Sequence, residues 1–243
     1  ADENLEISSK DELLHFLITW LKNYIEEELE DLINLIKNEN KNKYLRALSF
    51  QLYESNGVLK RTNINEVVKA ISKEDRKQFR NLGIKLGRYH VFLPKMLKPK
   101  AVSLRILLWK FFSGTSPNDA IPKSGLNFIV DEKRNFNSRF LLLCGFEKFK
   151  DFYVRVDILE KLFIKIIEKT KNGKFEIDSG MMNLLGCKKE NFIQLMGLMN
   201  YKKDKSNQEN TFVYKGERKI KKIQKFIKKN NSPFRKLESM SFK

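Results

Sequence analysis

The residue types that most often perform catalysis are few and scattered in this sequence. Its histidines, His15 and His90, and its cysteines, Cys144 and Cys187, all lie in separate segments. A nucleophile needs a nearby base, and zinc needs three or four closely placed nitrogen or sulfur ligands. The sequence therefore predicts neither a usual nucleophilic triad nor a zinc site. We expect a packed side chain at His15, an ordinary strand residue at His90 and two buried, reduced thiols.

The sequence also lacks the motifs that hold nucleotide phosphates. It contains no G-x-x-x-x-G-K-[ST] loop, and Gly83 and Gly87 form no dinucleotide-binding fingerprint. Pairs of carboxylates occur only on polar helical faces, where a solvated surface is the usual outcome. We therefore expect no cofactor in this chain, and neither binding nor hydrolysis of ATP.

The charge of the chain favours a polyanionic partner. It has 48 Lys and Arg residues against 30 Asp and Glu residues, a net charge of +18 over 243 residues. Residues 200–243 hold 14 bases and 4 acids, a difference of +10. A lysine-rich end can simply be solvated, or lie on a membrane. The apolar face of residues 217–229 is short for membrane binding, however, and no signal peptide or long apolar run occurs, so we expect a cytoplasmic protein.

The elements that would position these charges are mainly helices, with a few short strands. The sequence predicts a helical domain over residues 1–113, with one extended segment at 84–93. Its first helix begins at a Ser9–Glu12 capping box and is long and amphipathic, with an acidic outer face at residues 26–31. A second helix ends at Asn56-Gly57, Asn63 and Ser72 are expected caps of two short helices, and Pro99 opens another.

The remaining chain divides into three parts. Residues 114–156 predict a loop and short strands, with 140–146 ambiguous. Residues 157–215 have the order helix, strand, helix, turn, helix, hairpin, which predicts a winged-helix-like module. Its expected core is Phe163, Phe175, Ile177, Leu184, Leu185, Phe192, Leu195, Met199 and Phe212. Residues 216–243 are expected to form a basic amphipathic tail.

The second helix of such a motif normally enters a nucleic-acid groove, and the wing and tail follow the backbone. No arginine on that helix offers a bidentate guanine contact, so phosphate contact is favoured over base reading. Alternatively, the module packs against a neighbouring domain. The expected nucleic-acid-binding residues are Lys188, Lys189, Asn191, Gln194, Lys202, Lys203, Lys205, Lys215, Arg218, Lys219, Lys221 and Lys222.

Three stretches carry a resemblance to a known family. They are FRNLGIKLGRYHVFLPKMLKP (79–99) followed by LRILLW (104–109), FYVRVDILE (152–160), and MMNLLGC (181–187) followed by LMNYK (198–202). Together they resemble the region after the motor domains in alphaproteobacterial-type superfamily 2 ATP-dependent helicases, which are similar to the mitochondrial RNA-degradosome helicase. The resemblance spans residues 10 to 205. It implies that ATP and magnesium belong to motor domains elsewhere in the parent chain, and that RNA is favoured over DNA.

These observations lead to one hypothesis and two alternatives. The chain is expected to be a nucleic-acid-binding auxiliary region of an ATP-dependent RNA or DNA helicase, without the motor and without a membrane partner. The first alternative is a stand-alone winged-helix DNA-binding regulator. The second is a protein-interaction scaffold that uses the acidic first helix and the apolar faces.

Overall fold

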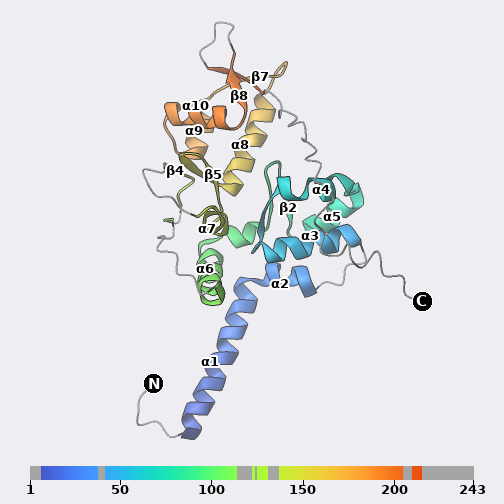
Figure 1. Cartoon of the computed structure of the whole chain (residues 1–243), viewed down its shortest axis with the longest axis vertical. Coiled ribbons are helices and arrows are strands. Elements are labelled where there is room, and N and C mark those ends of the chain that lie inside the picture. The colour runs from blue at the N-terminus through green and yellow to red at the C-terminus, as the bar shows by residue number, and fades with distance from the viewer. Residues whose placement is uncertain are drawn as a thin grey trace, which may run out of the picture.

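The described part of the chain is mainly helical with short strands, as the sequence predicts, and the strands form three small antiparallel sheets (Figure 1). The computed structural model describes residues 7–37, 42–113, 122–123, 125–130, 137–204 and 210–214. The tail expected over residues 216–243 lies outside them. Within the described residues, no helix combines the length and apolar character that crossing a membrane requires.

The first helix differs from the prediction in three ways. It is divided at Leu29 into α1 (Ile7–Glu28) and α2 (Glu30–Lys37). The Ser9–Glu12 capping box is wrong, because α1 already begins at Ile7 and Ser9 lies inside it. His15 is exposed rather than packed. Helical periodicity predicts that an apolar face exists, but it does not tell whether another element covers that face.

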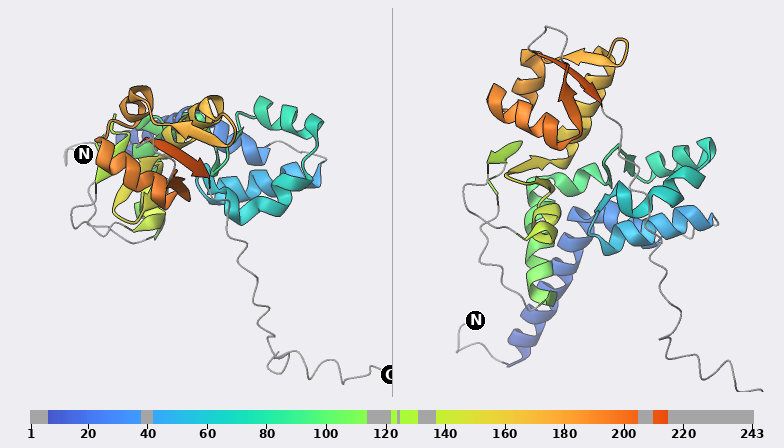
Figure 2. Two further views of the ribbon diagram at one scale, coloured as in Figure 1. Left: turned by 90° about the horizontal axis from the view of Figure 1, so that it is seen from above. Right: turned by 45° about the horizontal axis from the view of Figure 1, so that its top comes forward.

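Figures 1 and 2 show the N-terminal part of α1 projecting beyond the other elements of the chain. The elements from α1 to α6 (Pro99–Ser113), in residues 7–37 and 42–113, are here called the first body. Burial in it begins only past the end of α1, where Leu29, Leu32 and Leu35 enter the core. That core is completed by α3 (Lys43–Glu54), whose N-terminus is capped by the Asn42 side chain.

Two short helices follow a strand that the sequence did not reveal, β1 (Val58–Lys60). Asn63 is not a cap as predicted; it lies in the 3-10 turn η1 (Arg61–Ile64), which leads into α4 (Asn65–Ala70). The capping box at Ser72 is confirmed, since the Ser72 and Asp75 side chains each accept the other's backbone N–H at 3.1 Å. It starts α5 (Lys73–Asn81).

The extended segment predicted over 84–93 turns back on itself at residues 87–89. Its two arms are β2 (Lys85–Leu86) and β3 (His90–Phe92), and the sheet order is β1-β3-β2. After η2 (Pro94–Leu97), α6 (Pro99–Ser113) buries Arg105, whose guanidinium donates to the carbonyl groups of Asn56 and Met96. A buried cation therefore holds separate segments of the first body together.

The middle of the chain forms the second sheet. The ambiguous segment 140–146 separates into the helix α7 (Ser138–Leu143) and the start of β5 (Phe146–Phe149). Gly145, with φ +86°, makes the turn between them, where a Cβ would lie 2.8 Å from Leu97. Together with β4 (Phe128–Val130) and β6 (Phe152–Arg155), β5 gives the order β4-β6-β5.

The elements from α8 to β9 form the last body, which lies opposite α1, at the top of Figure 1. They follow one another in the predicted order. The sheet order of this body is β7-β9-β8, so the hairpin returns beside the first strand. The Asp178 side chain caps α9, and Gly186 ends it in the left-handed conformation. The elements are α8 (Val156–Lys169), β7 (Lys174–Glu176), α9 (Ser179–Leu185), α10 (Lys189–Leu198), β8 (Tyr201–Lys203) and β9 (Thr211–Tyr214).

Most of the predicted core residues of this body are buried together in one cluster. Phe163 lies outside that cluster: it is half-buried, and its ring meets Tyr89 of the first body edge-on, at 5.6 Å between centroids. Leu184 packs only at the margin of the cluster. A position on the apolar side of α8 can therefore serve an interface between bodies rather than a core.

We predict that Leu195→Asp strongly destabilises the chain. Leu195 is fully buried, so the substitution would place an unpaired carboxylate in the core at a cost of at least about 3 kcal/mol. Leu198→Asp on the same helix is the matched control, because Leu198 is 37% exposed. Chemical denaturation followed by circular dichroism would measure both, and equal unfolding midpoints would contradict this packing.

Candidate nucleic-acid interface

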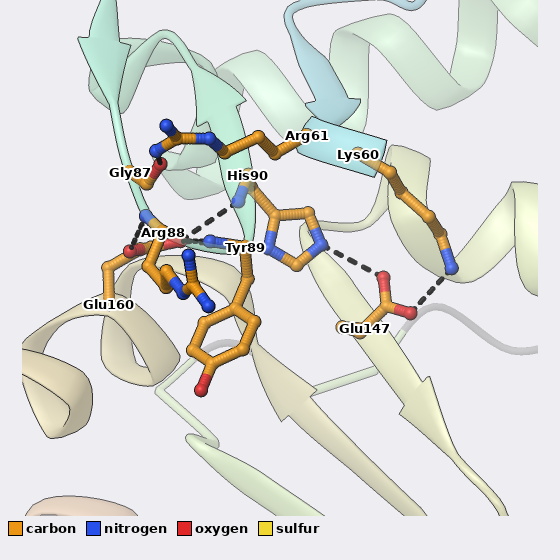
Figure 3. A network of polar contacts seen from close by, with 8 residues as sticks. All are labelled: Lys60, Arg61, Gly87, Arg88, Tyr89, His90, Glu147 and Glu160. Atoms are coloured by element: carbon orange, nitrogen blue, oxygen red, sulfur yellow. Dashed lines mark hydrogen bonds and ion pairs between the residues drawn. The ribbon is translucent and has the colours of Figure 1, made fainter. Parts of the chain in front are cut away.

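A buried carboxylate organises the loop between β2 and β3. Glu160, on α8, is 3% exposed. It accepts the backbone N–H groups of Arg88, Tyr89 and His90 at 2.6, 2.7 and 2.9 Å (Figure 3). Three successive N–H groups around one anion form a nest, which binds negative charge through fixed backbone dipoles. The last body is thereby fixed to the loop of the first.

Gly87 is required for this close approach. A Cβ at this position would lie 2.3 Å from the carboxyl carbon of Glu160, well inside any permitted contact. The Gly87 carbonyl also accepts a hydrogen bond from Arg61 Nη1 at 2.6 Å. The absence of a side chain at Gly87 therefore allows the loop to approach the carboxylate, and the Gly87 carbonyl holds Arg61 beside it.

A second carboxylate, Glu147 on β5, continues the network shown in Figure 3. Its oxygens lie 2.9 Å from His90 Nε2 and 2.5 Å from Lys60 Nζ. Burial alone would raise the pKa of Glu147, but the contacts with His90 and Lys60 outweigh it and lower that pKa. His90 is therefore a strand residue, as expected, that also joins the first sheet to the second.

Both carboxylates are already committed to hydrogen bonds, so the network favours positioning over general-base catalysis. Sequence reasoning missed Glu147 and Glu160. The signal for Glu160 is an acid between buried Leu159 and Leu162 on α8, where a solvated residue is not expected. No comparable signal marks Glu147, which lies on a strand with mixed burial.

The same loop contacts the hairpin of the last body through tyrosines. Tyr89 and Tyr201 share a side-chain hydrogen bond. The pKa of Tyr89 is raised, mainly by burial and in smaller part by the neighbouring Tyr201. The Tyr201 ring lies 5.2 Å from that of Tyr214 on β9, which is 39% exposed. Arg88 adds a cation 5.9 Å from the ring of Phe163. Positive charge and aromatic surface therefore meet at the base of the hairpin.

The predicted nucleic-acid-binding residues that the structure describes lie along α10 and just beyond it. Lys188 is the N-cap of the helix and Lys189 its first residue, and both are exposed; Gln194, in the middle of the helix, is also exposed, whereas Asn191 is half-buried. Exposed Lys202 and Lys203 follow the other end, about 15 Å away along a ten-residue helix. The other predicted residues lie outside the described residues: Lys205, Lys215, Arg218, Lys219, Lys221 and Lys222.

The thiols and possible metal ligands add no chemistry to this surface. Cys144 is buried as expected, while Cys187 is half-buried. Burial raises the pKa of Cys187 to about 11, so its thiol stays protonated at neutral pH. Among the described residues, no group of three or more His, Cys, Asp or Glu side chains is placed to hold a metal ion.

Comparison with known proteins does not identify a relative: no family model, curated protein or solved structure matches this chain.

We predict that Glu160→Gln lowers the stability of the chain by about 3 kcal/mol. The amide would keep one acceptor oxygen, but its NH2 group would set donor hydrogens against at least one backbone N–H that now donates to the carboxylate. Glu168→Gln is the control, since Glu168 is exposed on the same helix. Thermal and urea unfolding would measure both variants, and equal losses in the two would show that the nest is not a stabilising contact.

The contribution of Glu147 should depend on pH in a defined direction. Its lowered pKa in the folded chain means that its stabilisation is complete above the ordinary glutamate value of about 4.3 and is lost as pH falls through the folded value. We therefore expect the stability advantage of the wild type over Glu147→Gln to shrink as the pH falls below about 4.3. Urea denaturation across pH would measure it, and an advantage that grows on acidification below that value would refute the assignment.

Proposed function

We propose that this chain is a nucleic-acid-binding auxiliary region of an ATP-dependent helicase and that residues 157–215 act as a winged-helix module. The observation that carries the proposal is the exposed, cationic start of α10 within this topology. The order α8-β7-α9-α10-β8-β9 and the sheet order β7-β9-β8 are those expected of a winged helix. In that arrangement α10 is the helix presented to nucleic acid.

The electrostatics of α10 favour phosphate. Lys188 provides no side-chain cap, so no capping side chain competes with a ligand for the N–H groups of the first helical turn. These groups and the helix dipole attract anions, and the exposed Lys188 and Lys189 add two positive charges. Glu190 opposes them in part. Backbone contact without base reading fits this set, and the preference for RNA rests on the resemblance of the sequence.

A second surface supports an auxiliary role beside motor domains in the same parent chain. Phe16 and Trp20 of α1 are 64% and 55% exposed, and Phe111 and Phe112 of α6 are each 81% exposed. Figures 1 and 2 show that the two helices run side by side. A concentration of large apolar side chains on neighbouring helices is typical of a protein interface.

The same apolar surface favours the scaffold as a second candidate. The acidic face that this alternative also invoked is partly neutralised, however. Lys95 contacts both Glu30 and Asp31, and Lys100 lies 3.6 Å from Glu28. These ion pairs make the acidic face less available to a basic partner. A measurement of nucleic-acid binding separates the two candidates.

We predict that the chain binds single-stranded RNA with weak sequence preference. If about four to six phosphates are neutralised, the log–log salt slope is roughly −3 to −4. Lys188→Glu/Lys189→Glu should weaken binding at every sequence and make the slope shallower. Fluorescence anisotropy with labelled oligonucleotides would measure both effects. The control is Lys10→Glu/Lys22→Glu, which changes the net charge equally on the distant α1.

Deletion of residues 216–243 should reduce the slope further, because it removes Arg218, Lys219, Lys221, Lys222, Lys225, Lys228 and Lys229. Affinity and slope that are unchanged by the deletion and by the α10 variant would favour the scaffold instead.

A further inference from the structure

A basic groove lies outside the module, between α5 and β2. It is a cavity of about 630 Å³, and four of its seven lining residues are cationic. The lining is Lys73, Arg76, Arg80, Gly83, Ile84, Lys85 and Leu86. No acid is among these residues, and ligand sites for neutral molecules are usually lined mainly by apolar side chains. The composition therefore points to an anionic ligand.

The cations of α5 are arranged as a row. Lys73, Arg76 and Arg80 are all exposed and follow one another at spacings of three and four residues, which places them on one helix face. Among the described residues, none of the three forms an ion pair. The nearby Asp75 is engaged by Ser72 and Asn42. Neighbouring like charges repel, and an anion in the groove would relieve that repulsion.

The positive surface continues from the groove toward the hairpin of the module. Arg61, held by the Gly87 carbonyl, has its pKa lowered by burial and then by the nearby charges of Arg88 and Arg76. Arg61 is therefore near enough to one cation of the groove, Arg76, and to one of the loop, Arg88, for both charges to affect it. Tyr89 in that loop is hydrogen-bonded to Tyr201 of β8. Cations and aromatic rings thus connect α5 to the exposed Tyr214.

The length of this surface favours a chain of phosphates over a single anion. Lys73 and Arg80 are separated by about 10 Å along the helix axis, so one phosphate cannot bind at both ends of the row. Single-stranded nucleic acids are bound by cationic grooves that follow the backbone and by aromatic side chains that stack on bases. Both features are present here, in the groove and at Tyr214.

We propose that the groove of Lys73, Arg76, Arg80 and Lys85 binds the sugar–phosphate backbone of single-stranded nucleic acid, as a second site beyond α10. The inference rests on the proposed nucleic-acid-binding function and extends its surface across the β2–β3 loop. Arg61 and Arg88 would lie along the path between the two sites, and Tyr214 would offer a stacking surface.

The test compares Arg76→Glu/Arg80→Glu with Lys188→Glu/Lys189→Glu and the Lys10→Glu/Lys22→Glu control, all in the full chain. A labelled oligouridine long enough to reach both sites would be titrated by fluorescence anisotropy at several salt concentrations. We expect the groove variant to lose about tenfold in affinity. Its salt slope should become shallower by about 1.4, from two lost contacts at roughly 0.7 each. The neutral Arg76→Gln/Arg80→Gln variant guards against a folding defect and should lose less affinity in the same direction.

Each outcome separates the two proposals. Groove variants that bind like the α1 control overturn the groove inference, while a loss in the α10 variant alone leaves the proposed module standing. A loss in the groove variants alone supports the groove and rejects the role of α10. If neither the groove nor the α10 variants bind more weakly than the α1 control, both proposals fall. Inorganic phosphate that displaces the oligonucleotide more strongly than chloride at equal ionic strength would indicate a small-anion site and overturn the inference.

Discussion

The arrangement of the chain depends on the burial of Glu160. A carboxylate removed from water is costly by several kcal/mol unless its oxygens are hydrogen-bonded, and here the backbone of residues 88–90 provides that compensation. The donors and the acceptor belong to different bodies, so neither body satisfies its polar groups without the other. Gly87 permits the approach, and the contacts of Glu147 with Lys60 and His90 join the two sheets beside it. These contacts favour one fixed arrangement of the bodies.

That fixed arrangement decides which cationic and aromatic side chains lie together on the surface around the β2–β3 loop. The β2–β3 loop brings Arg88 and Tyr89 to the hairpin, and the Gly87 carbonyl holds Arg61 close to the cations of α5. Without the nest, α5 and α10 would present separate cationic patches to a flexible polyanion. With it, the two patches are held in one fixed arrangement, which is what the proposed binding of one strand at both sites requires, since linked sites bind more tightly than separate ones only when the geometry permits simultaneous contact.

The apolar surface lies elsewhere, on α1 and α6, at the opposite end of the chain from the module (Figure 1). The cationic and the apolar surfaces are therefore separate, and the exposed Trp20 and Phe111 are available for a contact that does not involve the module.

Local elements could be predicted from the amino-acid sequence because their signals lie within a few residues. Ser72 with Asp75 starts α5, and Gly186 ends α9, each through neighbouring backbone groups. Apolar periodicity likewise placed α8, α10 and most of the module core. The exposure of α1, the meeting of Glu160 with a loop 70 to 72 positions away, and the gathering of cations from η1, α5 and the β2–β3 loop followed only from the folded arrangement. Such contacts depend on how separate elements pack, and local sequence patterns do not encode that packing.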